Sequence, residues 1–415
     1  MKFSIITFGC RVNQADSLQL EQALQSRGGE SVSSDAADVV IVNTCSVTAS
    51  ADQGARQTIR RIARENPDVR IFATGCYATR RPDEVAALPN LVRVVRNDLK
   101  LELAEYTGLS TAERFSGGDG PCGASIGPGT RGRTAFTLRV QTGCDQHCSY
   151  CIIPTTRGKG RSVPIADVVR ESSRVAAAGF KEIALTGVHL GSYGRDLDTP
   201  TSLIELLIRL QAAVRGVTFR ISSLEPMDCT SDLVDLVAQS GGVFAPHFHL
   251  PLQHCSDRML EAMRRPYTVR FYRDLVERIV DRLPHAAIGS DMIVGFPGET
   301  EDDFLANVEY LPRSPLSHLH VFPYSDRPGT AASTIGEKVG GEVIRRRAAT
   351  LREIGTALAK RFRDRQIGTI RPGLTLEDGT AVVTDNYLKV KIPAGQGRNE
   401  RVSIRLLDAG AGVLA

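Results

Sequence analysis

Short apolar runs alternate with helical patterns over the first hundred residues. Residues 3–8, 39–43, 70–74 and 91–95 form apolar runs bounded by polar or turn residues, which is typical of short buried strands. Residues 17–27 and 49–65 carry apolar side chains at helical spacing instead. Alternation of this kind predicts a small parallel sheet with helices on its faces.

From residue 134 a longer alternation begins. Helical stretches such as 164–178 and 271–282 separate six candidate strands, at 136–140, 182–186, 218–222, 248–250, 287–294 and 317–322. Six strand–helix units predict a partial (β/α)6 barrel, smaller than the full eight-stranded form. The chain is therefore expected to be an α/β protein.

The last part of the chain has a different pattern. Residues 342–365 predict a helix with eight basic and three acidic side chains. Four short strand patterns follow, at 373–377, 380–384, 387–392 and 401–406, with turn signals between them, and predict a small antiparallel β-barrel. A basic helix alone is typical of a solvated face. Because small barrels of this kind often bind RNA, helix and barrel together favour an RNA-binding module.

The segment 116–133 has seven glycines in eighteen residues and no apolar period, which predicts a flexible linker. Cys122 lies inside it, and we assign that thiol no role. The expected organisation is an N-terminal domain, the linker, the barrel, the basic helix and the terminal barrel, at 1–115, 116–133, 134–340, 341–365 and 366–415.

Composition narrows the class of protein. The formal net charge of +4 is too small to indicate nucleic-acid binding by itself. The longest apolar runs, such as 39–42, are far shorter than the ~18 residues of a membrane span, and the N-terminus turns polar too soon for a secretory signal. Nine cysteines without an export signal favour reduced thiols and metal ligation over disulfides. We expect a cytoplasmic protein with no membrane partner.

Three of these cysteines lie in one loop, Gly143-Cys144-Asp145-Gln146-His147-Cys148-Ser149-Tyr150-Cys151, directly after the first barrel strand. A structural zinc or an all-cysteine iron–sulfur site takes four protein ligands, so three thiols leave one metal position open to a substrate or cofactor. Parallel barrels keep their active sites at this end of their strands. Two interpretations stay open: a catalytic cluster, or a zinc loop completed by His189, His249 or His254.

A second set of thiols, Cys10, Cys45 and Cys76, falls just past the ends of three different predicted strands. A lone cysteine is typical of a buried core thiol. Open parallel sheets, however, bind ligands at the carboxyl ends of their strands, where these three thiols should converge. The repeated placement favours a second three-cysteine metal site.

Taken together, the chain resembles the radical S-adenosylmethionine methylthiotransferases over essentially its whole length. The matching features are the GC, NTC and TGC cysteines, TGCDQHCSYCIIPTTRGKGRS, HLPLQ followed by SDRML, SDMIVGFPGETEDDF, HVFPYSDRPGT and a C-terminal module similar to the TRAM RNA-binding domain. The resemblance implies two 4Fe-4S clusters, one on each cysteine set, and replacement of an unreactive C–H hydrogen by a methylthio group. One S-adenosylmethionine is implied as the radical source, and a second as the methyl donor.

The resemblance also bears on the substrate. LTGVHLGSYGRDL and RISSLEP are similar to the branch that modifies threonylcarbamoyladenosine at position 37, beside the anticodon of tRNA. The isopentenyladenosine branch typically has a GQNVN-like sequence at residues 186–190, and the branch acting on a ribosomal-protein aspartate has a QDT-like one; both remain alternatives. The implied partners are the tRNA anticodon stem-loop, an electron donor such as flavodoxin or ferredoxin, and a sulfur source. A non-catalytic iron–sulfur or zinc RNA-binding protein is the alternative from another class.

Further site residues are expected at or near strand ends, with fold support as the alternative role for each. The expected cofactor contacts are Tyr150, Thr186, Gly187, Ser222, Glu225, Gly295 and Phe322. The expected substrate contacts are His189, Tyr193, Arg157 and Arg161, of which the two arginines either face phosphate or are solvated. His254-Cys255 replaces the Ser-Gly usual in the family, and Cys255 is expected to be a buried thiol rather than a residue of the active-site mouth.

Overall fold

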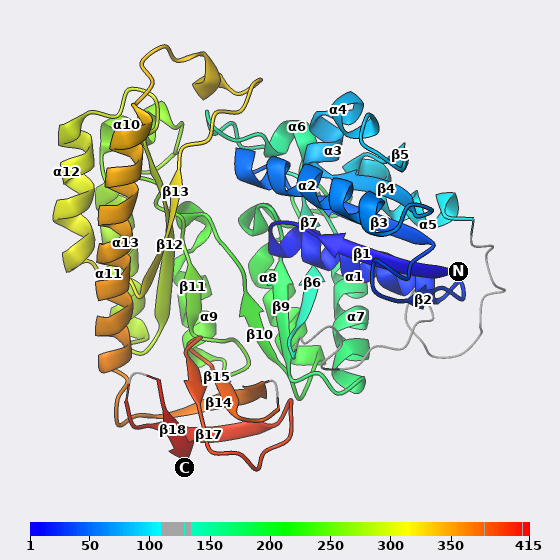
Figure 1. The fold of residues 1–415 in the computed structure, drawn as a ribbon. Helices are drawn as coiled ribbons and strands as arrows, with labels where there is room; N and C mark the ends of the chain where they lie inside the picture. Colours follow the sequence, from blue (N-terminus) through cyan, green and yellow to red (C-terminus); the bar gives the residue numbers. More distant parts are fainter. Residues whose placement is uncertain (109–127, 129–133, 377, 409) are drawn as a thin grey trace. The chain divides into compact units, whose positions relative to one another are not determined.

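The computed structural model describes residues 1–108, 128 and 134–415, apart from 377 and 409 (Figure 1). The chain divides into two compact units. The first unit contains Met1–Ile126, Gln141–His147 and Cys151–Arg161, and the second contains Gly127–Val140, Cys148–Tyr150 and Ser162–Ala415. Nearly all of the expected linker, including Cys122, lies outside the described residues, and the five-part division of the chain stays a prediction.

The first unit is built on a five-stranded parallel sheet of order β2-β1-β3-β4-β5. Its strands are β1 (Lys2–Thr7), β2 (Glu30–Ser31), β3 (Val39–Thr44), β4 (Arg70–Gly75) and β5 (Leu91–Val94). Its helices are α1 (Arg11–Gln25), α2 (Ala49–Glu65), α3 (Cys76–Arg80), α4 (Pro82–Ala86), the 3-10 turn η1 (Asn97–Glu102) and α5 (Leu103–Tyr106). The predicted sheet is confirmed, and the two-residue β2 is too short to give a sequence pattern.

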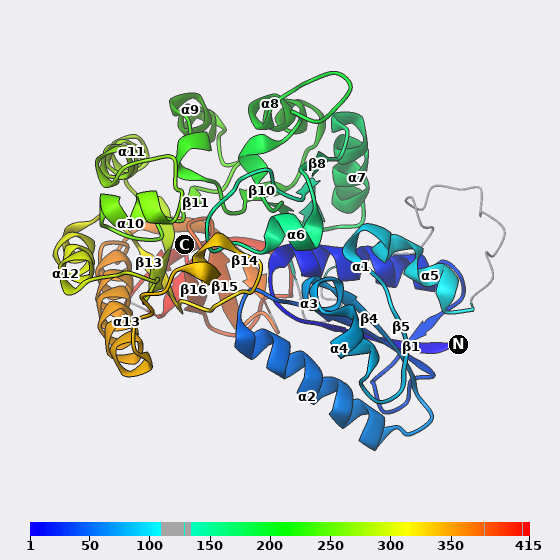
Figure 2. The same cartoon turned by 90° about the horizontal axis from the view of Figure 1, so that it is seen from above.

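Helices cover both faces of this sheet (Figure 2). Because successive strand residues point to opposite faces, Val40 and Val42 of β3 pack with Ile59 of α2, whereas Ile41 packs with Leu20 of α1. The strands are apolar on both faces, as expected for a parallel sheet buried by helices. The first cysteine set, Cys10, Cys45 and Cys76, lies just past the carboxyl ends of β1, β3 and β4.

The second unit holds six parallel strands in chain order, which confirms the partial barrel. They form two sheets, β6-β9-β10 and β11-β12-β13, joined by a bridge between Phe219 and Phe244. The strands are β6 (Phe136–Arg139), β9 (Glu182–Thr186), β10 (Thr218–Ile221), β11 (His247–His249), β12 (Ala287–Val294) and β13 (His318–Pro323). The helices are α7 (Ile165–Ala177), α8 (Leu203–Ala213), α9 (Ser231–Gln239), α10 (Asp257–Ala262), α11 (Val269–Arg282) and α12 (Glu301–Tyr310).

Most of these barrel helices begin at a residue whose side chain caps the helix N-terminus. A serine or threonine hydroxyl accepts a backbone N–H at the N-termini of α8 to α12, which satisfies a donor that the helix leaves unpaired. The capping residues are Ser202, Thr230, Ser256, Thr268 and Thr300. The helices therefore begin at defined residues, which fixes the lengths of the loops at the strand ends.

A basic helix, α13 (Gly341–Asp364), leads into a curled antiparallel sheet of order β16-β15-β14-β17-β18. Its strands are β14 (Ile370–Leu376), β15 (Ala381–Thr384), β16 (Lys389–Lys391), β17 (Arg401–Leu406) and β18 (Gly412–Leu414). Its outer strands approach each other at a bridge between Lys391 and Ala411. The predicted antiparallel architecture is confirmed, with β18 as an additional three-residue strand.

The curled sheet packs on residues at the amino ends of the barrel strands. The Arg220 side chain is 1% exposed and forms a fork with Glu182, with N–O distances of 3.0 and 2.9 Å. The same guanidinium donates to the carbonyl of Asp385, 2.9 Å away, and Asn386 donates to the carbonyl of His285, also at 2.9 Å. The buried Arg220–Glu182 pair therefore depends on the terminal sheet, which supplies a further hydrogen-bond acceptor for the guanidinium.

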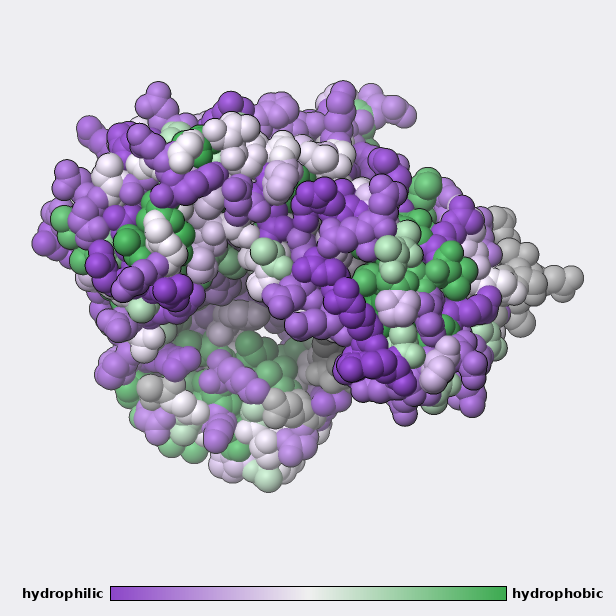
Figure 3. All heavy atoms as spheres, turned by 45° about the horizontal axis from the view of Figure 1, so that its top comes forward, coloured by the Kyte–Doolittle hydropathy of each residue, from purple (hydrophilic) through white to green (hydrophobic). Residues whose placement is uncertain are grey.

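Among the described residues, no helix is long and apolar enough to cross a membrane. Hydrophilic side chains predominate on the face shown in Figure 3, with smaller apolar groups between them. The cytoplasmic location stays a prediction.

Candidate active site

The first cysteine set lies at the carboxyl ends of three neighbouring strands. Cys10, Cys45 and Cys76 follow β1, β3 and β4 respectively. Cys10 is the N-cap of the fifteen-residue α1. Gly9 has a φ of +88°, and a Cβ there would lie 2.5 Å from Cys45 Sγ, so glycine permits this close approach of the two chain segments.

The surroundings of these thiols favour metal ligation. Burial raises the pKa of Cys45 to about 11; the backbone N–H of Val47 opposes this rise, and the charges of Cys10 and Cys76 add to it. Asn97 donates to Cys76 Sγ over 3.6 Å. Three neighbouring sulfurs become thiolates together when a cation compensates their charge, and thiolates suit iron–sulfur clusters. The donor set therefore fits the expected cluster.

Arg157, expected either to face phosphate or to be solvated, is instead buried in the first unit at the end of α6 (Ile153–Arg157). Its Nη2 lies 3.0 Å from Asp16 Oδ2 and 2.5 Å from Asn13 Oδ1. Asp16 also accepts from Lys100 Nζ at 2.8 Å. The charge of Arg157 is thus compensated inside the protein, whereas Arg161 is exposed and keeps the expected access to phosphate.

The second cysteine set lies in a loop whose start is fixed by backbone contacts. Gly143 has a φ of +73°, and a Cβ there would lie 1.8 Å from the carbonyl oxygen of Lys159. Cys144 donates its backbone N–H to Gly158 at 3.0 Å, and the N–H of Gln146 donates to Cys144 Sγ at 3.4 Å. All three thiols of the loop are partly exposed, as ligands of a cluster with an open position should be.

Within the second unit, Arg265 contacts Cys148. Its Nη1 lies 3.1 Å from Cys148 Sγ, while its other nitrogens bind Glu225 and the hydroxyl of Tyr267. Donors to ligand sulfurs tune iron–sulfur clusters. The Arg-Arg-Pro-Tyr stretch around Arg265 has no pattern that predicts this contact. Glu225, expected to bind cofactor, is the carboxylate partner of Arg265, and its contact with the cofactor stays a prediction.

Two of the expected cofactor residues have surroundings that fit a bound group. Tyr150 is partly buried against the cluster that contains Met259, Met263 and Phe296. Ser222 follows β10 and is buried, and its hydroxyl has no hydrogen-bond partner among the described residues. Buried hydroxyls are normally paired, so a polar group of a bound cofactor at Ser222 would complete the site.

The other expected cofactor residues sit at strand ends of the second unit. Thr186 ends β9 and is buried, and Gly187 follows it. Phe322 is exposed on β13. Gly295 follows β12 with a φ of +75°, and a Cβ there would lie 2.3 Å from Ile344 of α13.

Gly295 also belongs to a buried polar network that the sequence did not predict. The fully buried carboxylate of Glu299 accepts from the backbone N–H of Gly295, from Arg347 Nη1 at 3.1 Å and from His254 Nε2 at 3.2 Å. The Nδ1 of His254 accepts the N–H of Ser256, so the proton of this imidazole is on Nε2. Both ring nitrogens of His254 therefore have partners inside the protein, Glu299 at Nε2 and Ser256 at Nδ1.

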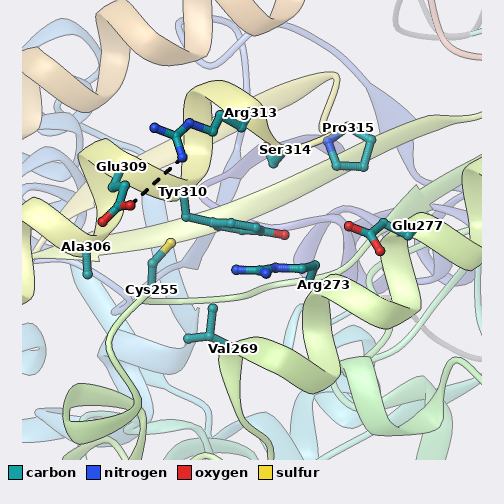
Figure 4. Close-up of a pocket in the computed structure, with 10 residues that line it drawn as sticks. All are labelled: Cys255, Val269, Arg273, Glu277, Ala306, Glu309, Tyr310, Arg313, Ser314 and Pro315. Atoms are coloured by element: carbon teal, nitrogen blue, oxygen red, sulfur yellow. Dashed lines mark ion pairs between the residues drawn. The ribbon is translucent and has the colours of Figure 1, made fainter.

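Cys255 lies beside a cavity of about 390 Å³ between α11 and α12, which is lined by residues such as Val269, Arg273 and Tyr310 (Figure 4). Burial raises the pKa of Cys255 well above the usual range for a thiol. These helices cover the outside of the strands, so Cys255 is a buried thiol, as expected, and does not lie at a strand end. Cys229, which also lies outside both cysteine sets, is likewise buried.

The stretch after β9 forms a compact charged group. His189 Nε2 lies 2.8 Å from Asp228 Oδ2, and Arg195 Nη2 lies 3.3 Å from Asp228 Oδ1. A Cβ at Gly191 would lie 2.2 Å from Asp228 Oδ2, so only glycine accommodates this carboxylate. His189 is buried, whereas the Arg195 side chain is 64% exposed. Arg195 is therefore the residue of this group that can reach a ligand.

Tyr193, the other expected substrate residue of this stretch, is fully buried. Its hydroxyl donates to the carbonyl of Val163 at 2.6 Å, and burial raises the pKa of this hydroxyl above its usual range. This placement corresponds to the alternative role, fold support, because Tyr193 holds the stretch in place.

Two family models match the chain: the uncharacterized protein family UPF0004 over residues 2–96, and the radical SAM superfamily over residues 138–311. Among solved structures, the radical S-adenosylmethionine methyltransferase TsrM of Kitasatospora setae has a TM-score of 0.56 at 16% identity, covering 80% of this chain and 76% of that one. At that identity the likeness shows the fold alone.

Curated relatives match nearly the whole chain. The threonylcarbamoyladenosine tRNA methylthiotransferase MtaB of Aquifex aeolicus is 36% identical over 94% of this chain and 96% of its own length, and that of Bacillus subtilis is 35% identical over 97% and 93%. The tRNA-2-methylthio-N(6)-dimethylallyladenosine synthase of Lawsonia intracellularis is 32% identical over 82% and 79%. On this evidence, the chain belongs to the radical S-adenosylmethionine methylthiotransferase family.

Proposed function

We propose that this enzyme methylthiolates carbon 2 of N6-threonylcarbamoyladenosine at position 37 of tRNA. The observation that carries the proposal is the presence of two sets of three free cysteines, one past the ends of the parallel strands β1, β3 and β4 and the other in the loop that follows β6. Each set is one ligand short of a closed four-cysteine site, and each holds a 4Fe-4S cluster in the proposed enzyme. The relatives in Aquifex aeolicus and Bacillus subtilis, which cover nearly all of the chain, support the choice of nucleoside.

The reaction needs chemistry that side chains do not supply. A C–H bond between two ring nitrogens offers no acidic proton, so a general base cannot activate it. When bound, the cluster on Cys144, Cys148 and Cys151 supplies the electron for radical cleavage of S-adenosylmethionine, and the cluster on Cys10, Cys45 and Cys76 holds the sulfur. A second S-adenosylmethionine supplies the methyl group.

The chain's own residues position these groups and tune them. Arg265 places a buried positive charge at Cys148 Sγ, which favours the reduced state of a bound cluster. Tyr150 offers an aromatic face to S-adenosylmethionine, and Ser222 offers a hydroxyl that has no partner in the part of the chain that the structure describes. Such preorganised contacts orient the cofactor and exclude water from the reacting atoms.

Arg195 is the proposed recognition residue for the threonylcarbamoyl group. Its guanidinium is exposed and pairs with Asp228, and His189 contacts the other oxygen of the same carboxylate. The threonylcarbamoyl group carries a carboxylate that accepts charge-assisted hydrogen bonds, which an isopentenyl group lacks. RNA phosphate contacts are proposed for Arg161 and for the exposed lysines of β16, Lys389 and Lys391.

Anaerobic reconstitution followed by two assays tests the proposal. With tRNA bearing threonylcarbamoyladenosine, we expect 5′-deoxyadenosine and a methylthiolated nucleoside by mass spectrometry, and little product with isopentenyladenosine tRNA. Replacing Cys144, Cys148 and Cys151 with Ala should abolish both products and about halve the bound iron, since each cluster contributes about half. Cys229→Ala, which changes a buried thiol outside both sets, should keep both. Preferential modification of isopentenyladenosine would favour the activity named for the Lawsonia relative.

A further inference from the structure

Imidazoles gather on one face of the sheet β11-β12-β13. Four of the eight histidines of the chain, His247, His249, His318 and His320, lie on its two outer strands. In the parallel register, Asp291 of β12 is opposite His320, and Gly289 is opposite both His249 and His318. Since residues two apart on a strand share a face, Asp291 lies on the same face as these histidines.

Three of these side chains converge on one point. His249 Nε2 lies 2.9 Å from Asp291 Oδ1, and His320 Nδ1 lies 3.3 Å from the same oxygen. One nitrogen of each histidine and one carboxylate oxygen all lie within 4.8 Å of one another. Zinc bonds of about 2.0–2.2 Å place neighbouring ligand atoms about 3–3.5 Å apart, so one ion fits among the three with small movements.

Glycine at position 289 makes room for this arrangement. A Cβ on Gly289 would lie 2.1 Å from His318 Nε2 and 2.9 Å from His249 Nδ1. Any larger residue would displace the imidazoles that border the point of convergence. The ring centroids of His249 and His320 are 5.2 Å apart, and the ring of His318 packs against both of these rings.

We propose that His249, Asp291 and His320 bind one Zn²⁺ ion. Two imidazoles and one carboxylate suit zinc, whereas Mg²⁺ and Ca²⁺ prefer oxygen ligands alone. This site contains no thiol, which distinguishes it chemically from both cysteine sets. His249 is buried, Asp291 is partly buried and His320 is exposed, so the remaining coordination position faces solvent. Three protein ligands with one open position is the arrangement of zinc sites that bind water or a carboxylate-bearing ligand.

The test measures metal rather than activity, so it is independent of the proposed reaction. Protein reconstituted with both clusters, so that the cysteines are occupied, is dialysed against Zn²⁺, and zinc and iron are counted by mass spectrometry. The comparison uses His320→Ala, Asp291→Asn and the matched control His285→Ala, an exposed histidine outside the group. His320 is itself exposed, so His320→Ala should fold, which circular dichroism checks.

We expect one zinc per chain with unchanged iron in the wild type and in His285→Ala. In His320→Ala and Asp291→Asn, zinc affinity should fall at least about tenfold, because changes in outer-shell partners alone cost about that much. X-ray absorption at the zinc edge should show only nitrogen and oxygen neighbours at about 2.0–2.2 Å. Equal zinc binding by folded His320→Ala, sulfur neighbours at about 2.3 Å, or no zinc in the wild type would overturn the proposal.

Discussion

The guanidinium of Arg265 lies against the thiol of Cys148, with 3.1 Å between Nη1 and Sγ. The Arg265 side chain is 2% exposed and is held by Glu225 and Tyr267. A charge fixed in this way cannot move away from the sulfur when the electron count of a bound cluster changes. The fixed positive charge of Arg265 therefore stabilises negative charge that is added at Cys148.

Replacing Arg265 with Gln should lower the reduction potential of the cluster on the Cys144 loop. A shift of about 60 mV corresponds to a tenfold change for a one-electron couple. Arg265→Lys keeps the charge and should recover part of the shift. Potentiometric titration followed by electron paramagnetic resonance measures the potential, and an unchanged potential in Arg265→Gln would show that the contact has no electrostatic role.

Replacing Asp16 with Asn should destabilise the first unit. Burial lowers the pKa of Lys100, and the Asp16 charge offsets only part of this fall. Loss of that charge leaves Lys100 and Arg157 buried without their carboxylate. Breaking a buried pair costs about 3–5 kcal/mol. Asp98→Asn, which removes an exposed partner of Arg96, should cost about 1 kcal/mol or less. Thermal unfolding and limited proteolysis compare the two, and equal stability would contradict the account.

The stability of α12 should depend on pH through Asp303. Burial raises the pKa of its carboxyl, but hydrogen bonds from Arg258, Ser256 and Thr300 outweigh this and hold the pKa below its usual 3.8. The group therefore stabilises the fold above that value, and its contribution is lost as the pH falls below it.

Asp303→Asn should accordingly lower the melting temperature at pH 7, by an amount corresponding to about 1.5–3 kcal/mol for weakened hydrogen bonds to a charged group. The difference from wild type should narrow as the pH falls below about 4. The exposed neighbour Asp302 gives the matched control, Asp302→Asn, with little effect at either pH. A difference that stays constant with pH would mean that the carboxylate charge is not what stabilises the cap.

The terminal sheet should be tested for RNA binding by surface substitution rather than by truncation. Deleting residues 366–415 removes the carbonyls that bind the buried Arg220 and should destabilise the barrel. Lys389→Ala with Lys391→Ala changes two exposed side chains, and thermal unfolding checks that the double variant folds. The double variant should weaken tRNA binding and reduce the salt slope of binding by about one unit for each phosphate that a lysine no longer neutralises. An unchanged slope would place the RNA-binding surface elsewhere.

Regular elements were predictable because their patterns are local. The predicted bounds of α2, β9, β12 and β17 match the structure, since each is a long helical period or a continuous strand pattern. The short β2 and β18 give too few residues for any pattern.

Side-chain partners were not predictable, because they join distant parts of the chain. Arg265 meets Cys148 across 117 positions, and Arg157 meets Asp16 across 141. The cysteine sets could be proposed because strand ends of a parallel sheet converge by topology, whichever residues pack around them. Arg157 shows the limit, because a basic residue in a short polar stretch has the same local sequence pattern whether it faces phosphate or a buried carboxylate.

The central claim is most directly tested by nucleoside mass spectrometry of tRNA from a strain lacking this gene. We predict loss of 2-methylthio-N6-threonylcarbamoyladenosine and accumulation of its unmethylthiolated precursor. A wild-type copy or the Cys229→Ala variant should restore the product, and Cys148→Ala should not. Loss of the isopentenyl product with the threonylcarbamoyl product intact, or restoration by Cys148→Ala, would contradict the account.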